Sequence, residues 1–436
     1  MVVVFVLVAL VMVGVLVTAN WYLWRRLFRD TTRAPGPVRR IGAVVIAGGW
    51  LLAVGALVAE RTGAPFWLQR VLAWPGFLWL ALSIYLLLAV LAGEVVRPLL
   101  RMLLERRAAA RPTEGAQPSV SPAADTSRIP AGTAPPKAPG TPETPGTPVP
   151  ASEGASPSPL ALPSRRLFVS RVVAGAAAAA AVGTVGYGTY GVLNGPSVKR
   201  VTVPLARLPR AAHGFRIAVV SDIHLGPVLG RGFAQKVVDT INSTQPDLIA
   251  VVGDLVDGSV KDLGPAAAPL AQLKARHGAY FVTGNHEYFS GAEQWVAEVR
   301  RLGLLPLENA RTELPHFDLA GVNDVAGEDE GQGPDYDRAL GDRDRSRACV
   351  LLAHQPVQIH DAVDHGVDLQ LSGHTHGGQL WPGNLIAGAA NPTLAGLERY
   401  GDTQLYVSRG AGAWGPPTRV GAPSDITVIQ LASRQA

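Results

Sequence analysis

Cysteine is almost absent from this sequence of 436 residues. The single one is Cys349, so no disulfide can form within the chain and no zinc site built from cysteines is available. Cys349 stands in the apolar stretch Ala348–Leu352, which predicts a buried strand where the thiol acts as a small hydrophobic side chain. A reactive thiol is therefore disfavoured, and the redox compartment is left open.

Acidic residues are scarce in the first half of the chain and common in the second. Residues 1–199 hold 19 Lys and Arg against 8 Asp and Glu, which gives +11, whereas residues 200–436 hold 20 against 26, which gives −6. The overall net charge of +5 therefore comes from the first half. Because the half that carries the candidate chemistry is acidic, a groove for nucleic acid is disfavoured and nucleic acid is an unlikely partner.

Three long apolar segments open the chain, at Val2–Trp24, Ile41–Ala59 and Val71–Val96. Each is long enough to cross a bilayer as a helix. The first lacks the positively charged start of a cleaved signal peptide, which favours an uncleaved span. We predict that residues 1–107 form three transmembrane helices.

Arginines mark which loops face the cytoplasm. The loop after the second span has only Arg61 and Arg70, whereas the loops after the first and third spans are rich in arginine. Those arginines are Arg25, Arg26, Arg29, Arg33, Arg39, Arg40, Arg97, Arg101, Arg106, Arg107 and Arg111. An excess of positive charge is typical of cytoplasmic loops, so the chain is expected to start outside and to reach residue 108 inside.

Residues 108–163 are dominated by Pro, Ala, Ser, Thr and Gly, which predicts a disordered linker. Residues 164–194 then form a fourth apolar segment that begins with Ser-Arg-Arg-Leu-Phe-Val. This start resembles a twin-arginine export signal, and arginines that simply flank a span explain it equally well. Both interpretations make the protein a multi-pass membrane protein with residues 195–436 outside the cytoplasm.

From Phe215 onward, short apolar runs alternate with Gly- and Asp-rich loops and with helical stretches. This alternation indicates an α/β domain. The predicted strands are Arg216–Val220, Leu248–Val252, Ala279–Val282, Phe317–Ala320, Ala348–Leu352, Leu369–Leu371, Gln404–Val407 and Ile426–Leu431. The predicted helices are Phe233–Asn242 and Ala292–Leu302.

Five polar clusters each follow one of these strands directly. They are Ser221-Asp222-Ile223-His224, Gly253-Asp254, Gly284-Asn285-His286-Glu287, His354 and Gly373-His374-Thr375-His376. Loops beyond the carboxyl ends of strands converge on one edge of an open α/β sheet, so we expect these clusters to share a cavity. Asp, His and Asn without thiolate suit Mn²⁺, Fe²⁺ or Zn²⁺ in a catalytic site rather than a structural zinc.

In this order, the motifs D-x-H, GD, GNH(D/E), an isolated His and GHxH resemble the calcineurin-like metallophosphoesterase family over about residues 215–431. The extended Gly373–Gln379 and Val407–Gly412 are similar to its membrane-anchored YkuE/YaeI-type branch. The resemblance implies an α/β fold for residues 195–436, with two sheets in an α/β/β/α sandwich, preceded by α-helical transmembrane segments.

The same resemblance implies two divalent metal ions, Mn, Fe or Zn, that share Asp254. One metal would be held by Asp222, His224, Asp254 and His376. The other would be held by Asp254, Asn285, His354 and His374. His286 would act beside them as a general acid or phosphate clamp, and Asp257 would orient His286, although a turn-capping role for Asp257 is the alternative.

The implied activity is that of a phosphoric ester hydrolase, in which a hydroxide activated between the two metals attacks a phosphate monoester, diester or pyrophosphate. Phosphoproteins are disfavoured as substrates, because Gly258 and Ser259 follow Asp257 where protein phosphatases usually have Arg-Gly. The membrane tether suggests a lipid or cell-wall substrate. Arg409 and Arg419 are candidates for phosphate contacts, with a solvated or ion-paired arginine as the default.

Two other functions stay open from sequence. A non-catalytic membrane sensor or binding module would retain the metals or phosphate without turnover, and a nuclease is disfavoured by the acidic second half. The substrate, the native metals, the fate of the fourth span and the oligomeric state are undetermined by the sequence.

Overall fold

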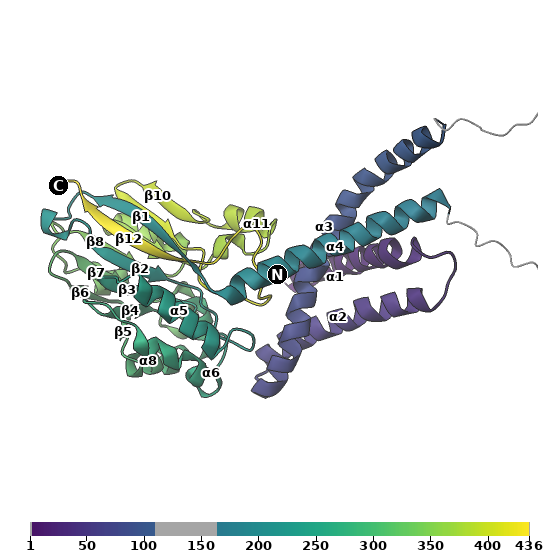
Figure 1. The fold of residues 1–436 in the computed structure, drawn as a ribbon. Coiled ribbons are helices and arrows are strands. Elements are labelled where there is room, and N and C mark those ends of the chain that lie inside the picture. The colour runs from purple at the N-terminus through teal and green to yellow at the C-terminus, as the bar shows by residue number, and fades with distance from the viewer. Residues whose placement is uncertain (1, 110–163, 436) are drawn as a thin grey trace, which may run out of the picture.

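The computed structural model describes residues 2–109 and 164–435, with four long helices at one end and an α/β domain at the other (Figure 1). Each of the four helices is long and apolar enough to cross a membrane. They are α1 (Val2–Trp24), α2 (Pro37–Arg61), α3 (Phe66–Ala109) and α4 (Arg165–Asn194). The linker expected at residues 108–163 falls almost wholly outside the described residues.

The long helices pack through small side chains. Ala81 of α3 and Ala177 and Ala181 of α4 are buried in one cluster, and small residues let apolar helices approach closely. At the end of the bundle far from the α/β domain, Arg26 contacts Glu94 at 2.7 Å. The end of α1 therefore meets α3 far from the domain, and the last part of α3 runs on beyond the other helices (Figure 1).

Two six-stranded sheets form the α/β domain. The first has the order β1-β12-β2-β3-β4-β5 and the second β10-β11-β9-β8-β7-β6. The strands of the first sheet are β1 (Ser197–Leu205), β12 (Asp425–Ser433), β2 (Arg216–Val220), β3 (Leu248–Val252), β4 (Ala279–Val282) and β5 (Leu305–Pro306). Those of the second are β10 (Gly396–Tyr400), β11 (Thr403–Val407), β9 (Leu369–Ser372), β8 (Cys349–Leu352), β7 (Asp318–Gly321) and β6 (Ala310–Glu313).

The core lies in three layers because the central strands are apolar on both faces. In β3, Leu248 and Val252 face the cluster between the two sheets, whereas Ile249 and Val251 face the cluster under the outer helices. Strands buried on both faces read as continuous apolar runs. The predicted two-sheet sandwich preceded by long apolar helices is confirmed.

Helices cover the outer face of each sheet. The first sheet is covered by α5 (Arg231–Ser243), α6 (Val260–Ala267) and α8 (Ala292–Arg301). The second packs against α9 (Tyr336–Leu340) and α10 (Ile359–Asp364). Two further helices lie at the ligand loops: α7 (Asn285–Ser290) begins at Asn285, and α11 (Gly383–Ala390) follows the loop that carries His376.

All eight predicted strands are present, three with the predicted bounds and the other five with bounds that differ by one or two residues. Sequence analysis did not predict β1, β5, β6 and β10. Strand β1 begins at Ser197, three residues after α4 ends at Asn194, and pairs in parallel with β12. This short connection ties the fourth apolar helix directly to the first sheet.

The α/β domain rests on the helices through loops near the second sheet. The Tyr85 hydroxyl of α3 donates a hydrogen bond to the Trp381 carbonyl at 3.0 Å. Thr189 of α4 and Thr418 are hydrogen-bonded at 2.7 Å. A Cβ at Gly188 would overlap the carbonyl of residue 419, so the absence of a side chain at Gly188 permits this close contact.

Candidate metal centre

The polar clusters lie where central strands of the two sheets end. Strands β2, β3 and β4 are parallel neighbours in the first sheet, and β8 and β9 are parallel neighbours in the second. Their carboxyl ends meet at one edge, as parallel strands require. The structure brings the seven predicted metal ligands together at this edge.

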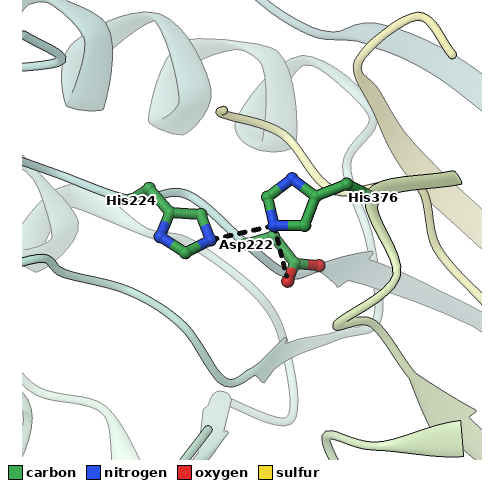
Figure 2. Close-up of side chains that lie close together, drawn as sticks. All are labelled: Asp222, His224 and His376. Atoms are coloured by element: carbon green, nitrogen blue, oxygen red, sulfur yellow. Dashed lines mark hydrogen bonds and ion pairs between the residues drawn. The ribbon is translucent and has the colours of Figure 1, made fainter. Parts of the chain in front are cut away.

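The first group consists of Asp222, His224 and His376 (Figure 2). The Nε2 atoms of His224 and His376 lie 3.0 Å apart. His376 Nε2 lies 3.5 Å from Asp222 Oδ1, and His224 Nε2 lies 3.8 Å from Asp254 Oδ2. All three members of the first group are buried, so their polar atoms face one another rather than water.

The second group consists of Asn285, His354 and His374. His354 Nε2 lies 3.1 Å from Asp254 Oδ2, and His374 Nδ1 lies 3.0 Å from Asn285 Oδ1. Asp254, His354 and His374 each offer a ligand atom within 4.8 Å of the others. Asp254 therefore stands between the first and second groups, at hydrogen-bond range of the second and 3.8 Å from the first.

In His354 and His224, a hydrogen bond or contact made by Nδ1 leaves Nε2 facing the cluster. His354 Nδ1 donates to the Val252 carbonyl at 2.9 Å, and His224 Nδ1 contacts Asp257 Oδ1 at 2.8 Å. In the neutral rings, Nε2 is then left bare, and His354 Nε2 has no hydrogen-bond partner among the described residues. A bare nitrogen beside a buried carboxylate oxygen is unfavourable unless a proton or cation lies between them. The donor set therefore fits divalent cations.

Arg419 holds His376 in a different way. Its guanidinium donates to His376 Nδ1 at 3.1 Å and to the His376 carbonyl at 3.0 Å. A neutral His376 therefore carries its proton on Nε2, so a cation at Nε2 would require this proton to move to Nδ1 and would leave Arg419 bonded to His376 only through the His376 carbonyl. Arg419 is only 6% exposed and its hydrogen bonds go to protein atoms, so the solvated arginine that was one of the expectations from sequence is wrong. A phosphate contact by Arg409 stays a prediction.

The ligand loops adopt a backbone conformation that is uncommon outside glycine. Positive φ occurs at Asp222 (53°), His224 (49°), Asp254 (52°), His374 (70°) and His376 (52°). These are five of the eight non-glycine residues with positive φ in the described parts of the chain. Such residues are costly and cluster at functional sites, which supports a functional role for this edge.

Two glycines let neighbouring loops meet. A Cβ at Gly284 would overlap the Asp254 carboxylate, and one at Gly253, whose φ is +74°, would overlap the His354 ring. Each glycine therefore makes room for a polar side chain of a neighbouring loop.

Charges within the cluster shift its pKa values in opposite directions. Burial alone would lower the pKa of His354, but the Asp254 carboxylate raises it well above its usual value. Burial would raise the pKa of Asp254, but the charge of His354 lowers it. For His374, burial and the charge of His354 both act downward and lower the pKa to about 4. Protons therefore balance the carboxylates in the absence of cations, and cation binding must release them.

Asp257 joins His286 to the cluster. Its Oδ1 lies 2.7 Å from His286 Nδ1 and 2.8 Å from His224 Nδ1. Burial would lower the pKa of His286, but the hydrogen bond and charge of Asp257 raise it to about 9. The structure thus places Asp257 where it orients both rings, of which sequence analysis expected only His286.

Glu287 is a residue whose role sequence analysis missed. Its fully buried carboxylate accepts the backbone N–H groups of Asp254 (2.9 Å), Leu255 (2.7 Å) and Gly284 (2.6 Å). Burial and the charge of Asp254 raise its pKa to about 7. Glu287 ties the loops after β3 and β4 together, and its place in the Gly284–Glu287 motif was the available signal.

A cavity of about 670 Å³ opens at the cluster. It is lined by residues of both groups, by Asp257 and His286, and by Glu60 and Arg61 at the end of α2. Sequence analysis did not anticipate that the membrane helices reach this cavity, because it treated them as an anchor alone.

Sequence comparisons with known proteins point to the same kind of site. The family model for calcineurin-like phosphoesterases matches residues 215–378. The chain is 37% identical over 273 residues to an uncharacterized metallophosphoesterase of Helicobacter pylori, covering 62% of this chain and 73% of that protein. It is 31% identical over 280 residues to the uncharacterized metallophosphoesterase YkuE of Bacillus subtilis, covering 62% of this chain and 98% of that protein.

A transmembrane protein with metallophosphoesterase domain from Danio rerio is 38% identical over 259 residues. The match covers 56% of this chain and 59% of that protein, so the chain spans less than two thirds of the length of this relative.

Proposed function

The chain belongs to the calcineurin-like phosphoesterase family, and from this premise we propose that it is a two-metal hydrolase of phosphate monoesters, diesters or pyrophosphates. The observation that supports this most is the position of Asp254. Its buried carboxylate stands between the first and second groups, 3.1 Å from His354 Nε2 and 3.8 Å from His224 Nε2. A shared carboxylate between two sets of nitrogen and oxygen ligands is an arrangement that suits a pair of cations.

We assign the two cations to the two groups, with Asp254 common to both. The first would be held by Asp222, His224, Asp254 and His376, and the second by Asp254, Asn285, His354 and His374. Imidazole, carboxylate and amide ligands suit Mn²⁺, Fe²⁺ or Zn²⁺. When bound, such a pair supplies an ionised water near neutral pH and polarises the phosphoryl oxygens.

His286 is proposed as the proton donor to the leaving group. Its pKa of about 9 keeps it protonated at neutral pH, and Asp257 fixes its ring through Nδ1 at 2.7 Å. As the oxygen of water bonds to phosphorus, the bond from phosphorus to the leaving oxygen breaks and that oxygen takes the proton of His286. General acid help of this kind contributes about 10²- to 10⁴-fold in rate.

We propose that the catalytic domain lies outside the cytoplasm. The ends of α2 and α4 that meet the domain carry few arginines, whereas arginines concentrate at the far end of the bundle (Figure 1). Arginine-rich ends of spans face the cytoplasm. Fusion of a reporter active only outside the cytoplasm to the C-terminus is expected to give signal, and signal from a reporter active only inside would contradict this orientation.

The activity is tested with the full-length chain purified in nanodiscs, loaded with Mn²⁺ and assayed on bis-p-nitrophenyl phosphate and p-nitrophenyl phosphate. We expect hydrolysis that a chelator abolishes and added Mn²⁺ restores. Two bound cations per chain without hydrolysis of any ester or pyrophosphate would instead support a non-catalytic binding module.

A further inference from the structure

The cavity at the metal cluster has one wall made by the membrane helices. Leu57, Glu60 and Arg61 at the end of α2, with Phe66 and Gln69 at the start of α3, line it together with side chains of the α/β domain. The turn between α2 and α3 therefore reaches the metal cluster. A substrate that enters the cavity passes between the domain and the ends of two membrane helices.

Exposed apolar side chains flank the cavity beside His286. Phe289 and Trp414 line it, are 71% and 49% exposed, and place their rings 5.5 and 5.7 Å from the His286 ring. Leu57, on the wall from α2, is 41% exposed. A small polar ester gains little from an apolar rim, whereas a hydrocarbon chain attached to the phosphate would cover it.

The segment that follows His376 is unusually free of charge. Residues 377–397 contain no Asp, Glu, Lys, Arg or His, and α11 within this segment buries none of its side chains. Leu385 and Ile386 of α11 are 68% and 77% exposed. Exposed, contiguous apolar side chains on an uncharged helix are typical of a surface that contacts a partner or a membrane.

The position of α11 favours the bilayer as the partner that covers its exposed apolar side chains. The segment is fixed to the spans, because Tyr85 of α3 donates to the Trp381 carbonyl and Leu380 packs in the cluster between the spans. In Figure 1, α11 lies on the side of the α/β domain that faces the four long helices. Near the same end of α4, Tyr187 and Tyr190 are 81% and 65% exposed, as expected of aromatic side chains at a membrane interface.

Building on the proposed hydrolase function, we infer that the substrate is a phosphate ester carried by a membrane lipid. Helix α11 and the turn between α2 and α3 lie in the headgroup region of the leaflet. The lipid phosphate reaches the metal cluster from the bilayer, and its hydrocarbon part lies along Leu57, Phe289 and Trp414. Water cleaves the bond between phosphorus and the leaving oxygen, and that oxygen takes the proton of His286. A monoester gives an alcohol and phosphate, and a diester gives an alcohol and a phosphomonoester. A pyrophosphate gives two phosphates.

The test compares long-chain and short-chain substrates of the same ester type. The full-length chain in nanodiscs with Mn²⁺ is assayed on dioleoyl and dibutyryl phosphatidic acid, on dioleoyl and dibutyryl phosphatidylglycerol, and on a long polyprenyl pyrophosphate against isopentenyl pyrophosphate. For at least one pair, kcat/KM is expected to favour the long chain by about tenfold or more. Ratios near one or below for all three pairs, with bis-p-nitrophenyl phosphate still hydrolysed, would overturn the lipid inference alone. Failure on every substrate would remove the proposed function itself.

Helix α11 is tested with a matched pair of variants. Leu385→Asp places a charge on α11, and Leu305→Asp does so at an equally apolar position, 48% exposed, in β5 at the edge of the first sheet. Both substrates of a pair are measured on one preparation, so misfolded protein lowers both rates and leaves the ratio unchanged. The preference for the long chain is expected to fall in Leu385→Asp and to persist in Leu305→Asp. If the ratio of kcat/KM for the long-chain substrate to kcat/KM for the short-chain substrate is the same in both variants, membrane contact by α11 is contradicted.

Contact of α11 with lipid is measured directly by labelling Ile386→Cys with bimane in nanodiscs. Cys349 is fully buried and does not compete for the label. Brominated lipid is expected to quench the fluorescence more than aqueous iodide. Stronger quenching by iodide, or protection from both quenchers with two chains per nanodisc, would show water or a second copy over α11 and refute the inference.

Discussion

The first and second groups of the metal cluster lie on either side of Asp254 and are held in different ways. The first group contains the carboxylate of Asp222 and is fixed from behind by two charged side chains, Asp257 and Arg419. The second group has no carboxylate of its own, and its His354 is fixed by a backbone carbonyl. The two proposed cation sites therefore differ in charge and in how many of the supporting side chains a substitution can change.

Loss of the shared carboxylate gives the largest expected effect. Asp254→Asn removes the one negative charge common to both groups while keeping the size of the side chain. We expect loss of both cations and a fall in hydrolysis of about a thousandfold or more, because metal ions supply several kcal/mol of transition-state stabilisation. Elemental analysis and hydrolysis of bis-p-nitrophenyl phosphate measure the two effects, and full retention of either cation would disprove the shared role.

The charge difference between the groups is tested by Asp222→Asn against Asn285→Ala. The first substitution removes a full charge near its cation, and even two unit charges 4 Å apart interact by about 4 kcal/mol at an effective dielectric constant of 20. The second removes a neutral amide. We expect the affinity for one cation to fall on the order of 10²- to 10³-fold in Asp222→Asn and about tenfold in Asn285→Ala.

Titration of each variant with Mn²⁺, followed by calorimetry, measures these affinities. Equal losses in Asp222→Asn and Asn285→Ala would remove the charge difference on which the comparison depends. Loss of both cations from Asn285→Ala would show that the two groups act as one unit.

Asp257→Asn tests the contact of Asp257 with His224 of the first group and its contact with the proposed proton donor His286 together. The Asp257 charge raises the pKa of His286 to about 9, so its loss lowers that pKa toward the ordinary value. Because activity needs protonated His286, the alkaline limb of the pH–rate profile is expected to move to lower pH. The rate is expected to fall by about 10- to 100-fold, as for other changes behind metal ligands.

A pH–rate profile of kcat for wild type and Asp257→Asn makes this measurement. His286→Asn is the control, because it removes the titrating ring and is expected to remove the alkaline limb altogether. An unchanged limb in Asp257→Asn would show that Asp257 does not set the protonation of His286.

The parts of the molecule that could be predicted are those whose pattern lies within a short stretch of sequence. The strands before Asp222 and Asp254 are continuous apolar runs, and each ends in a polar motif, so both the strand and the clustering of its loop followed from sequence. Strand β1 escaped prediction because Lys199, Arg200 and Thr202 interrupt its apolar residues. Strand β5 has only two residues, too few for any periodic pattern.

Contacts between distant segments had no such signal. Glu60 and Arg61 lie more than 160 residues before the first of the ligand loops at the cavity that they line. Arg419 was expected to be solvated, ion-paired or in contact with phosphate, and only the packing of its loop against His376 reveals its buried position. Sequence patterns thus predicted which polar side chains meet at this edge, while the contacts of Arg419 with His376 depended on tertiary structure.

The smallest expected effect comes from Arg419→Lys, which alters the support behind the first group alone. A lysine keeps the positive charge but loses the planar set of donors that now contacts the ring and carbonyl of His376, and arginine and lysine are not interchangeable at such sites. We expect about tenfold weaker binding of one cation and no change for the other. No side-chain substitution removes the Val252 carbonyl behind His354, so the second group offers no counterpart. If Arg419→Lys weakens the binding of both cations equally, the effect of Arg419 on the first group also reaches the second group through Asp254.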